Sequence, residues 1–354
     1  MSTRNLRSIE PESRTPCRRT QRNLRAVAIF FLLTFLPPAL CFAVSPAGET
    51  KKEASAPAPL APGAYFGLKL PGETPELFAP GIINIPGRNV ERVAFSPDGT
   101  ECYFTVWNGA ANSSSTGILF TRYENGAWTP QAPAAFFADG RERRAITFSS
   151  DGNRLYFDGF FSAKNSTDPN FWMVRRAARR EKWSDPEPLP APINDSPKTV
   201  QVFALTADGT MYFSSNRDGG LGGFDIYRTV SKPGQPLQVE NLGTPVNSKF
   251  DDGGPGISPD GHTLIFYSIL NRPGAISRYS DLFICFDNGH GGWTSPVNMG
   301  EGFNTPEDEY GAYAATFSQD GRVLFFTRFN WQRGESQVYW VSTTALERFR
   351  KLSH

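Results

Sequence analysis

Histidine and cysteine are scarce in this chain of 354 residues, and each shortage excludes a kind of chemistry. The three histidines are His262, His290 and His354. A multi-histidine metal centre needs more imidazoles than this, and a Ser-His-Asp triad is disfavoured. The sequence also lacks a C-x-x-C pair and a G-x-S-x-G element, which removes a common redox motif and the hydrolase nucleophile elbow. Composition therefore names no reaction.

An excess of charge of one sign is also missing. The 36 Lys and Arg residues nearly cancel the 35 Asp and Glu residues, for a formal net charge of +1. Seven of the arginines lie in the first 25 residues, so the remaining chain is net acidic and has no basic stripe. Because such a stripe is what neutralises phosphates, we expect no nucleic acid partner.

The first 43 residues form a leader unlike the rest of the chain. A basic stretch is followed by the apolar run AVAIFFLLTFLPPALCFAV at residues 26–44 and by small residues near Ala47. This order is typical of a secretory signal peptide, so we expect export to the periplasm or outside the cell. An uncleaved anchor over residues 26–44 is the alternative, because the run nearly spans a bilayer. The anchor would be the chain's only membrane contact.

The sequence after the leader divides into a spacer and one domain. Residues 44–65 are rich in Ala, Pro, Lys and Glu and have no hydrophobic period. Such a segment buries too little apolar surface to fold, so we expect a flexible linker. The patterned sequence of residues 66–354 is expected to form a single domain.

A strand, an Asp-Gly turn and a second strand recur five times. In the first copy, Pro97 presets φ for the turn, Asp98 bonds the nearby backbone and Gly99 accepts a positive φ. We therefore assign the turn aspartates, spaced by 53, 57, 52 and 60 residues, to structure rather than to ligand binding. The copies are VAFSPDGTECYFT (93–105), ITFSSDGNRLYFD (146–158), FALTADGTMYFSS (203–215), GISPDGHTLIFYS (256–268) and ATFSQDGRVLFFT (315–327).

Each unit continues into a third apolar stretch, and four units add an outer segment, which begins at Trp128, Trp183, Leu237 and Trp293. Four strands per unit at this repeat length predict the blades of a propeller. We therefore predict an all-β fold, a five-bladed β-propeller of four-stranded antiparallel blades. Six blades are the alternative, although the chain has no residues left for a sixth.

The fifth unit lacks an outer strand, and the missing segment is found near the N-terminus. LFAPGIIN (77–84) matches VNMGEGFN (297–304) in its Gly and Asn, and it precedes the first unit as that segment precedes the fifth. We predict that this N-terminal strand completes the last blade and closes the ring, which removes open sheet edges. At the other end, Leu346, Phe349 and Leu352 are spaced as on the buried face of a short capping helix.

These repeats resemble the TolB-like, WD-type propeller repeats of exported bacterial proteins. The resemblance covers about residues 64–350 and rests on FSPDG, SSNRDGGLGGFDIY (214–227), NLGTPVNS (241–248), NMGEGFNTPEDEY (298–310) and VYWVS. It implies a β-propeller in the cell envelope or outside the cell. The better understood relatives are protein-interaction modules, and the resemblance transfers no catalytic residue to this chain.

Three residues with reactive or charged side chains are assigned structural roles. Cys102 and Cys285 lie in apolar strand-like runs of non-adjacent units, so we expect buried free thiols rather than a disulfide. Asp225 begins the third strand of its unit near Arg217, and we interpret it as an ion pair or a turn lock.

Acidic residues precede four of the five predicted inner strands, which line the axis of a propeller. Acids that converge there could bind a cation, a sugar or a basic peptide, and mutual repulsion would raise some of their pKa values. Alternatively, they are solvated loop charges balanced by Arg92, Arg143 and Arg144, and the third unit has Lys198 and Gln201 instead. The candidate ligand-binding residues of this axial rim are Glu91, Glu142, Asp252 and Glu309.

The sequence favours a non-catalytic binding or scaffolding propeller of the cell envelope. It would present loops and the axial rim to a protein or an envelope polymer. We expect no cofactor and no metal site, since a D-x-D-x-D-G loop is absent. The alternative is a glycosidase-type enzyme with paired carboxylates in a central funnel, drawn from Glu91, Asp252 and Glu309.

Overall fold

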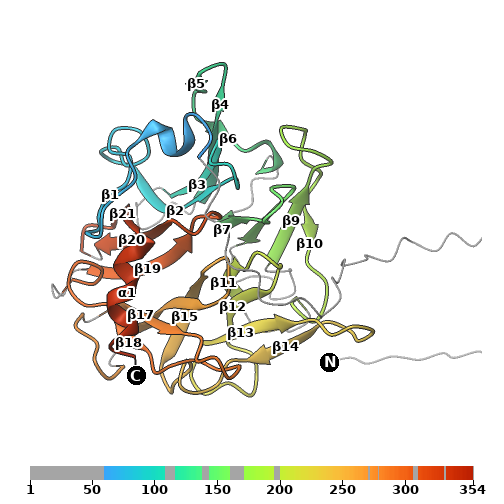
Figure 1. Ribbon diagram of the computed structural model, residues 1–354. Helices are drawn as coiled ribbons and strands as arrows, with labels where there is room; N and C mark the ends of the chain where they lie inside the picture. Colours follow the sequence, from blue (N-terminus) through green and yellow to red (C-terminus); the bar gives the residue numbers. More distant parts are fainter. Residues whose placement is uncertain are drawn as a thin grey trace, which may run out of the picture. The chain divides into compact units, whose positions relative to one another are not determined.

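Five antiparallel sheets follow the five sequence repeats in the computed structural model (Figure 1). The structure describes residues 60–107, 116–137, 143–159, 171–194, 200–269, 272–277, 279–305, 310–330 and 332–353. Within each repeat the three longer strands pair in chain order, and a short fourth strand pairs with the third. The predicted five-bladed β-propeller is confirmed.

The strands of each blade are named from the axis outward. Blade 1 contains β2 (Asn89–Phe95), β3 (Glu101–Trp107) and β4 (Thr116–Glu124), and its outer strand is split into β5 (Ala127–Trp128) and β6 (Ala132–Pro133). Blade 2 contains β7 (Arg143–Phe148), β8 (Arg154–Gly159), β9 (Phe171–Arg175) and β10 (Glu187–Pro188). Blade 3 contains β11 (Val200–Leu205), β12 (Met211–Ser215), β13 (Asp225–Val230) and β14 (Gln238–Asn241).

Blade 4 contains β15 (Asp251–Ile257), β16 (Thr263–Ile269), β17 (Ser280–Phe286) and β18 (Val297–Asn298). Blade 5 contains β19 (Tyr310–Phe317), β20 (Val323–Asn330) and β21 (Glu335–Ser342), and its outer strand is β1 (Glu76–Leu77). Short helical turns complete the described chain at η1 (Ala64–Gly67), η2 (Ala135–Phe137), η3 (Thr343–Leu346) and α1 (Glu347–Arg350).

The inner strands close a circle. Each of β2, β7, β11 and β15 contacts the inner strand of the following blade, and β19 contacts β2. Separate apolar clusters fill the spaces between neighbouring blades, with fully buried Phe104, Phe157, Phe213 and Phe266 among their members. The apolar faces of the alternating strands are thus buried against neighbouring blades.

The Asp-Gly turns are held by the aspartate side chain. Asp260 Oδ1 accepts hydrogen bonds from Ser258 Oγ at 2.5 Å and from the His262 N–H at 3.0 Å. The backbone φ of Gly261 is 77°, in the left-handed region that favours glycine. The structural role predicted for these aspartates is confirmed, because Asp98, Asp151, Asp208 and Asp320 make the same pair of hydrogen bonds.

The N-terminal segment closes the ring as predicted. In β1, Glu76 and Leu77 pair with Trp340 and Tyr339 of β21. Asn84 then spans to the same strand: its Nδ2 donates to the Val338 carbonyl at 2.9 Å, and its Oδ1 accepts from the Val338 N–H at 3.1 Å. Blade 5 is therefore built from both ends of the described chain.

The same asparagine clamp recurs in three other blades, which confirms the match between residues 77–84 and 297–304. In blade 4, Asn304 accepts from the Leu282 N–H at 2.8 Å and donates to its carbonyl at 3.0 Å. Asn247 and Asn194 bind Ile226 and Phe171 in the same way. Each clamp satisfies a backbone donor and acceptor that the short outer strand leaves unpaired.

Arginines of the following blade brace these clamped turns. The carbonyl directly before the clamp asparagine accepts a hydrogen bond from an arginine at four blade junctions. In the best-covered case, Arg272 Nη1 donates to the Val246 carbonyl at 2.8 Å, and its guanidinium lies over Phe266 and Phe283. The pairs are Arg217–Ile193, Arg272–Val246, Arg328–Phe303 and Arg88–Ile83.

The junction of blades 1 and 2 uses a buried ion pair instead. Both guanidinium nitrogens of Arg176 donate to the Glu101 carboxylate, at 3.0 and 2.7 Å, and both side chains are almost fully buried. The guanidinium also lies over Trp183, whose Nε1 donates to Tyr103 Oη at 2.9 Å. Bidentate geometry and the extra partners make this pair structurally specific.

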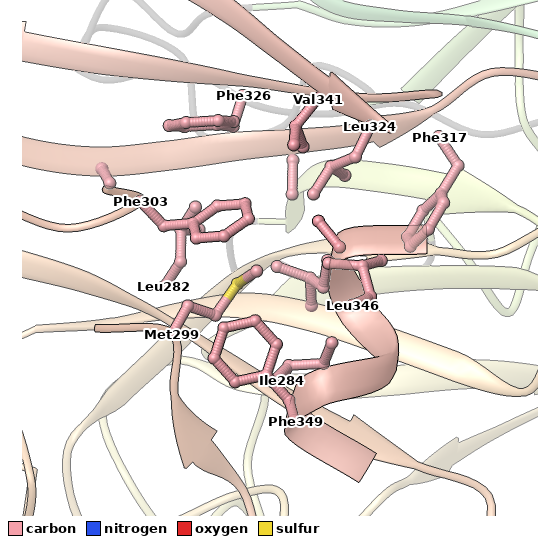
Figure 2. Packing of buried hydrophobic residues seen from close by; sticks show 14 of the residues in the cluster. Leu282, Ile284, Met299, Phe303, Phe317, Leu324, Phe326, Val341, Leu346 and Phe349 are labelled. Atoms are coloured by element: carbon pink, nitrogen blue, oxygen red, sulfur yellow. The ribbon is translucent and has the colours of Figure 1, made fainter. Parts of the chain in front are cut away.

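The C-terminal turn packs between blades 4 and 5, as Figure 2 shows. Leu346 and Phe349 are buried beside Met299 and Phe303, as the sequence predicts. The prediction for Leu352 was wrong: it is 66% exposed. The reason is that α1 ends at Arg350, so the helical spacing does not extend to this residue.

Two smaller sequence predictions also meet the described structure. Cys102 and Cys285 are free and fully buried, as expected, and burial raises the pKa of each thiol. At the start of the described chain, Ala64 and Tyr65 of the predicted linker are buried, and the Tyr65 ring centroid lies 4.8 Å from that of Phe95. The packed part of the chain thus includes the last residues of that segment.

Asn84→Ala tests the closure. The substitution removes three buried hydrogen bonds, to the carbonyls of Phe78 and Val338 and from the Val338 N–H. We expect the free energy of unfolding in urea to fall by about 2–4 kcal/mol, because the backbone groups lose their partners without gaining water. Ile82→Ala in the same turn, where the side chain is 37% exposed, is the control. A loss below about 0.5 kcal/mol for Asn84→Ala would show that the clamp does not hold the ring.

Candidate functional site

The inner strands are irregular where they meet at the axis. All five carry a register shift against the second strand of their blade: between Val90 and Arg92 in β2 and at the equivalent place in β7, β11, β15 and β19. Ala145, Val202 and Ala314 have positive φ values of 44°, 44° and 56° at these bulges. A bulge changes the direction in which side chains point, and such strain is typical of functional positions.

Arg92 crosses the axis. From β2 of blade 1, its Nη1 donates to the Phe203 carbonyl of blade 3 at 3.1 Å and its Nη2 to the Ala315 carbonyl of blade 5 at 3.3 Å. The side chain is 3% exposed, and burial lowers the pKa of Arg92 to about 10, so the guanidinium stays charged at neutral pH. Nearer the turns, Gln319 of blade 5 donates to the Phe148 carbonyl of blade 2 at 3.1 Å.

Four further side chains interact electrostatically around Arg92, and we call the group the axial cluster: Glu91, Arg92, Arg144, Asp158 and Tyr313. Blades 1, 2 and 5 contribute to it. Glu91, Arg144 and Tyr313 are partly exposed, whereas Asp158 is 6% exposed. The cluster therefore has an accessible upper layer over a buried lower layer.

Burial sets the protonation behaviour of the two acids. Loss of water raises the pKa of Glu91; Arg144 and Arg92 oppose the shift, while Asp158 adds to it. Burial also raises the pKa of Asp158, against the opposing effect of the Val202 N–H and the two arginines. The pKa of Tyr313 is raised by burial and by Glu91, so its phenol stays protonated. The cluster thus offers both donors and acceptors at neutral pH.

Asp158 occupies a position that is polar in other blades as well. The equivalent Ser214 accepts from the Gly254 N–H at 2.8 Å, and Thr327 donates to the Glu91 carbonyl. Asp158 Oδ2 accepts from the Val202 N–H at 3.2 Å, so each of these side chains ties its blade to the bulge of the next. Its Oδ1 is buried and has no hydrogen-bond partner among the described residues. Asp158 was missed by sequence analysis, although an acid ending the apolar run LYFD was a signal.

The predicted rim residues have different locations. Glu91 belongs to the axial cluster. Asp252 is fully buried, where Arg272 Nη1 donates to it at 2.6 Å and Ser248 donates through its N–H at 2.7 Å and its Oγ at 2.6 Å. Glu142 and Glu309 lie outside the described residues. Sequence analysis named Arg144 only as a balancing charge and did not select Tyr313, because strand alternation does not reveal the bulge that directs them.

Asp225 acts as a turn lock. Its carboxylate accepts from the Leu221 N–H at 2.6 Å and the Gly222 N–H at 3.0 Å. Within the described ranges, no group of three or more His, Cys, Asp or Glu side chains is placed to hold a metal ion. The helices of that same part of the chain are too short or too polar to cross a bilayer. The leader and its predicted anchor, residues 26–44, lie outside the described residues.

Glu91→Gln tests the electrostatics of the axial cluster. Since the folded state raises the pKa of Glu91 above its unfolded value, the folded state binds the proton more tightly. The resulting stability is present below the unfolded pKa and is lost as the pH rises through the folded pKa. Urea unfolding of Glu91→Gln between about pH 4 and pH 7 should therefore decline less with rising pH than that of wild type. Glu73→Gln, at an exposed glutamate, is the control, and equal pH dependence of wild type and Glu91→Gln would contradict the assignment.

Comparison with known proteins gives a likeness of fold only. No family model matches the chain, and no curated protein matches it. Among solved structures, a protein of Agrobacterium tumefaciens assigned as TolB is 16% identical, with 73% of this chain and 78% of that chain covered and a TM-score of 0.44. An α-L-arabinanase of Penicillium chrysogenum complexed with arabinobiose is 13% identical, with 77% and 98% covered and a TM-score of 0.45. A periplasmic gluconolactonase of Pseudomonas aeruginosa is 17% identical, with 67% and 64% covered and a TM-score of 0.39.

Proposed function

We propose that this protein is a non-catalytic binding propeller of the cell envelope, which holds a polar group of a protein or an envelope polymer at its axial end. The observation that supports the proposal is the axial cluster. Glu91, Arg144 and Tyr313 come from three different blades and remain partly exposed above the buried guanidinium of Arg92. A carboxyl group, a guanidinium and a phenol side by side can accept and donate hydrogen bonds to one polar ligand.

The charges of the cluster favour binding over acid-base chemistry. Both arginines act on both acids, so neither carboxylate stands alone at the axis. Asp252, the second acid of the predicted glycosidase set, is fully covered by Arg272 and Ser248. A paired-carboxylate hydrolysis needs two carboxyl groups that reach the same bond, with one of them free to act as base or nucleophile. The envelope location rests on the leader sequence.

Arg144→Ala tests the proposed binding. The exported chain is incubated with insoluble peptidoglycan and, separately, with immobilised envelope polysaccharide, and the bound fraction is measured by sedimentation. We expect retention on at least one polymer, with affinity at least tenfold weaker for Arg144→Ala, because a charge-assisted hydrogen bond contributes about 1.5–3 kcal/mol. Arg154→Ala at the opposite end of β8 is the matched control, since Arg154 is exposed there.

For a protein ligand the same pair of variants is compared in cross-linking from a photoreactive residue at Gln201, which is partly exposed in β11. Equal retention and equal cross-linking of Arg144→Ala and Arg154→Ala would contradict the axial site. Release of reducing sugar from a polysaccharide, abolished by Glu91→Gln, would replace the binding function by the glycosidase alternative, for which the raised pKa of Glu91 would suit a general acid.

A further inference from the structure

Two neighbouring blades expose an aliphatic side chain at the same place in their architecture. Leu221, in the loop between β12 and β13, is 50% exposed, and Ile276, between β16 and β17, is 38% exposed. Their backbone N–H groups donate to equivalent aspartates, Asp225 at 2.6 Å and Asp281 at 2.5 Å. The equivalence shows that the two exposures come from one repeated loop design rather than from two unrelated loops.

The blade 3 loop is fixed against the start of blade 4. A Cβ on Gly222 would lie 1.9 Å from the Phe250 carbonyl oxygen, and one on Gly223 would lie 2.1 Å from Asp251 Oδ1. The same Asp251 oxygen accepts from the Phe224 N–H at 3.0 Å. Only glycine permits this close approach, so the loop is held in a conformation that leaves Leu221 in solvent.

The blade 4 loop is fixed in the same manner. Asp281 also accepts from the Ser277 N–H at 3.2 Å and from Asn298 Nδ2 at 2.7 Å. Arg272, where the loop begins, donates to the Val246 carbonyl at 2.8 Å, and Ala275 packs on the apolar cluster between blades 3 and 4. Both loops therefore border the segment of residues 245–250, which leads from blade 3 to blade 4.

That segment supplies a positive charge between the two loops. Lys249 is exposed, and its Nζ lies 5.3 Å from the ring centroid of the partly exposed Phe250. The loops that join second to third strands lie at the end of the blades where the inner strands begin, because the strands are antiparallel. The surface thus consists of two fixed aliphatic side chains with a cation alongside.

We propose that Leu221, Lys249 and Ile276 form a docking surface for a protein segment that supplies aliphatic side chains to the two loops and a carboxylate to Lys249. Because the backbone of both loops is already ordered, binding costs little additional conformational entropy. Small fixed apolar contacts beside a charge fit a protein partner, whereas adsorption to a lipid surface requires a wider apolar face. The proposal does not depend on the axial site.

The test uses a random-peptide library displayed on phage and selected on the exported chain. We expect enriched peptides that combine aliphatic and acidic residues. Their affinity, measured by fluorescence polarisation with synthetic peptides, should fall at least tenfold in Leu221→Ser/Ile276→Ser and in Lys249→Glu. Ile82→Ser/Leu352→Ser is the matched control, because these two aliphatic side chains are also exposed (37% and 66%) but lie elsewhere, and it should bind as wild type does.

The outcomes separate this surface from other occupants. Peptide binding unchanged in both surface variants, or lost in Arg144→Ala but not in them, would overturn the proposal. A dimer in sedimentation that disappears in Leu221→Ser/Ile276→Ser would identify a second copy of the chain as the occupant. Binding to phosphatidylglycerol vesicles that disappears in the same variant would identify a lipid surface, and either result would overturn the peptide proposal. All substitutions are at exposed side chains, and unchanged thermal midpoints would verify that the variants are folded.

Discussion

The architecture depends on how each blade's outer turn is fixed to the blade that follows. One asparagine closes the turn onto the third strand of its own blade, and an arginine of the next blade binds the carbonyl beside it. At the junction of blades 5 and 1, this arrangement joins Asn84 to Val338 and Arg88 to Ile83. Residues from opposite ends of the described chain are thereby tied into one circle. Without that tie, blade 5 would expose an unpaired edge and the inner strands would lose their common axis.

The axial cluster exists only because the circle is closed. Arg92 reaches carbonyl groups of blades 3 and 5, so its two hydrogen bonds require three blades at fixed relative positions. A buried guanidinium without those acceptors would be costly, and the neighbouring Glu91 and Asp158 offset its charge. Polar side chains of the second strands, Asp158 and Ser214 among them, hold the bulges that direct the cluster toward the axis. Stability and the candidate site are therefore properties of the same contacts.

The sequence predicted the features that repeat and missed those that differ between repeats. Periodic spacing of the turn aspartates and the shared Gly and Asn of 77–84 and 297–304 were sufficient for the blade number and the closure. Glu91 and Asp252 look alike in sequence, as acids at the start of inner strands. Only the fold shows that Arg272, distant by 20 residues, covers one of them. Asp158, Arg144 and Tyr313 were not selected as a site, because a bulge shifts side-chain direction by an amount that strand alternation does not record.

Native-state hydrogen exchange at the Val338 and Phe78 amides tests the closure most directly. The Val338 N–H donates to Asn84 Oδ1 at 3.1 Å and the Phe78 N–H to the Val338 carbonyl at 2.9 Å, so both report on the contact between the chain's two ends. If the ring opens only when the protein unfolds, these amides exchange with the same free energy as the Ile226 and Leu282 amides, which make the equivalent clamps inside blades 3 and 4. Exchange of Val338 and Phe78 at a much lower free energy, with Ile226 and Leu282 still protected, would contradict the account, because the N-terminal strand would then detach from an otherwise intact fold.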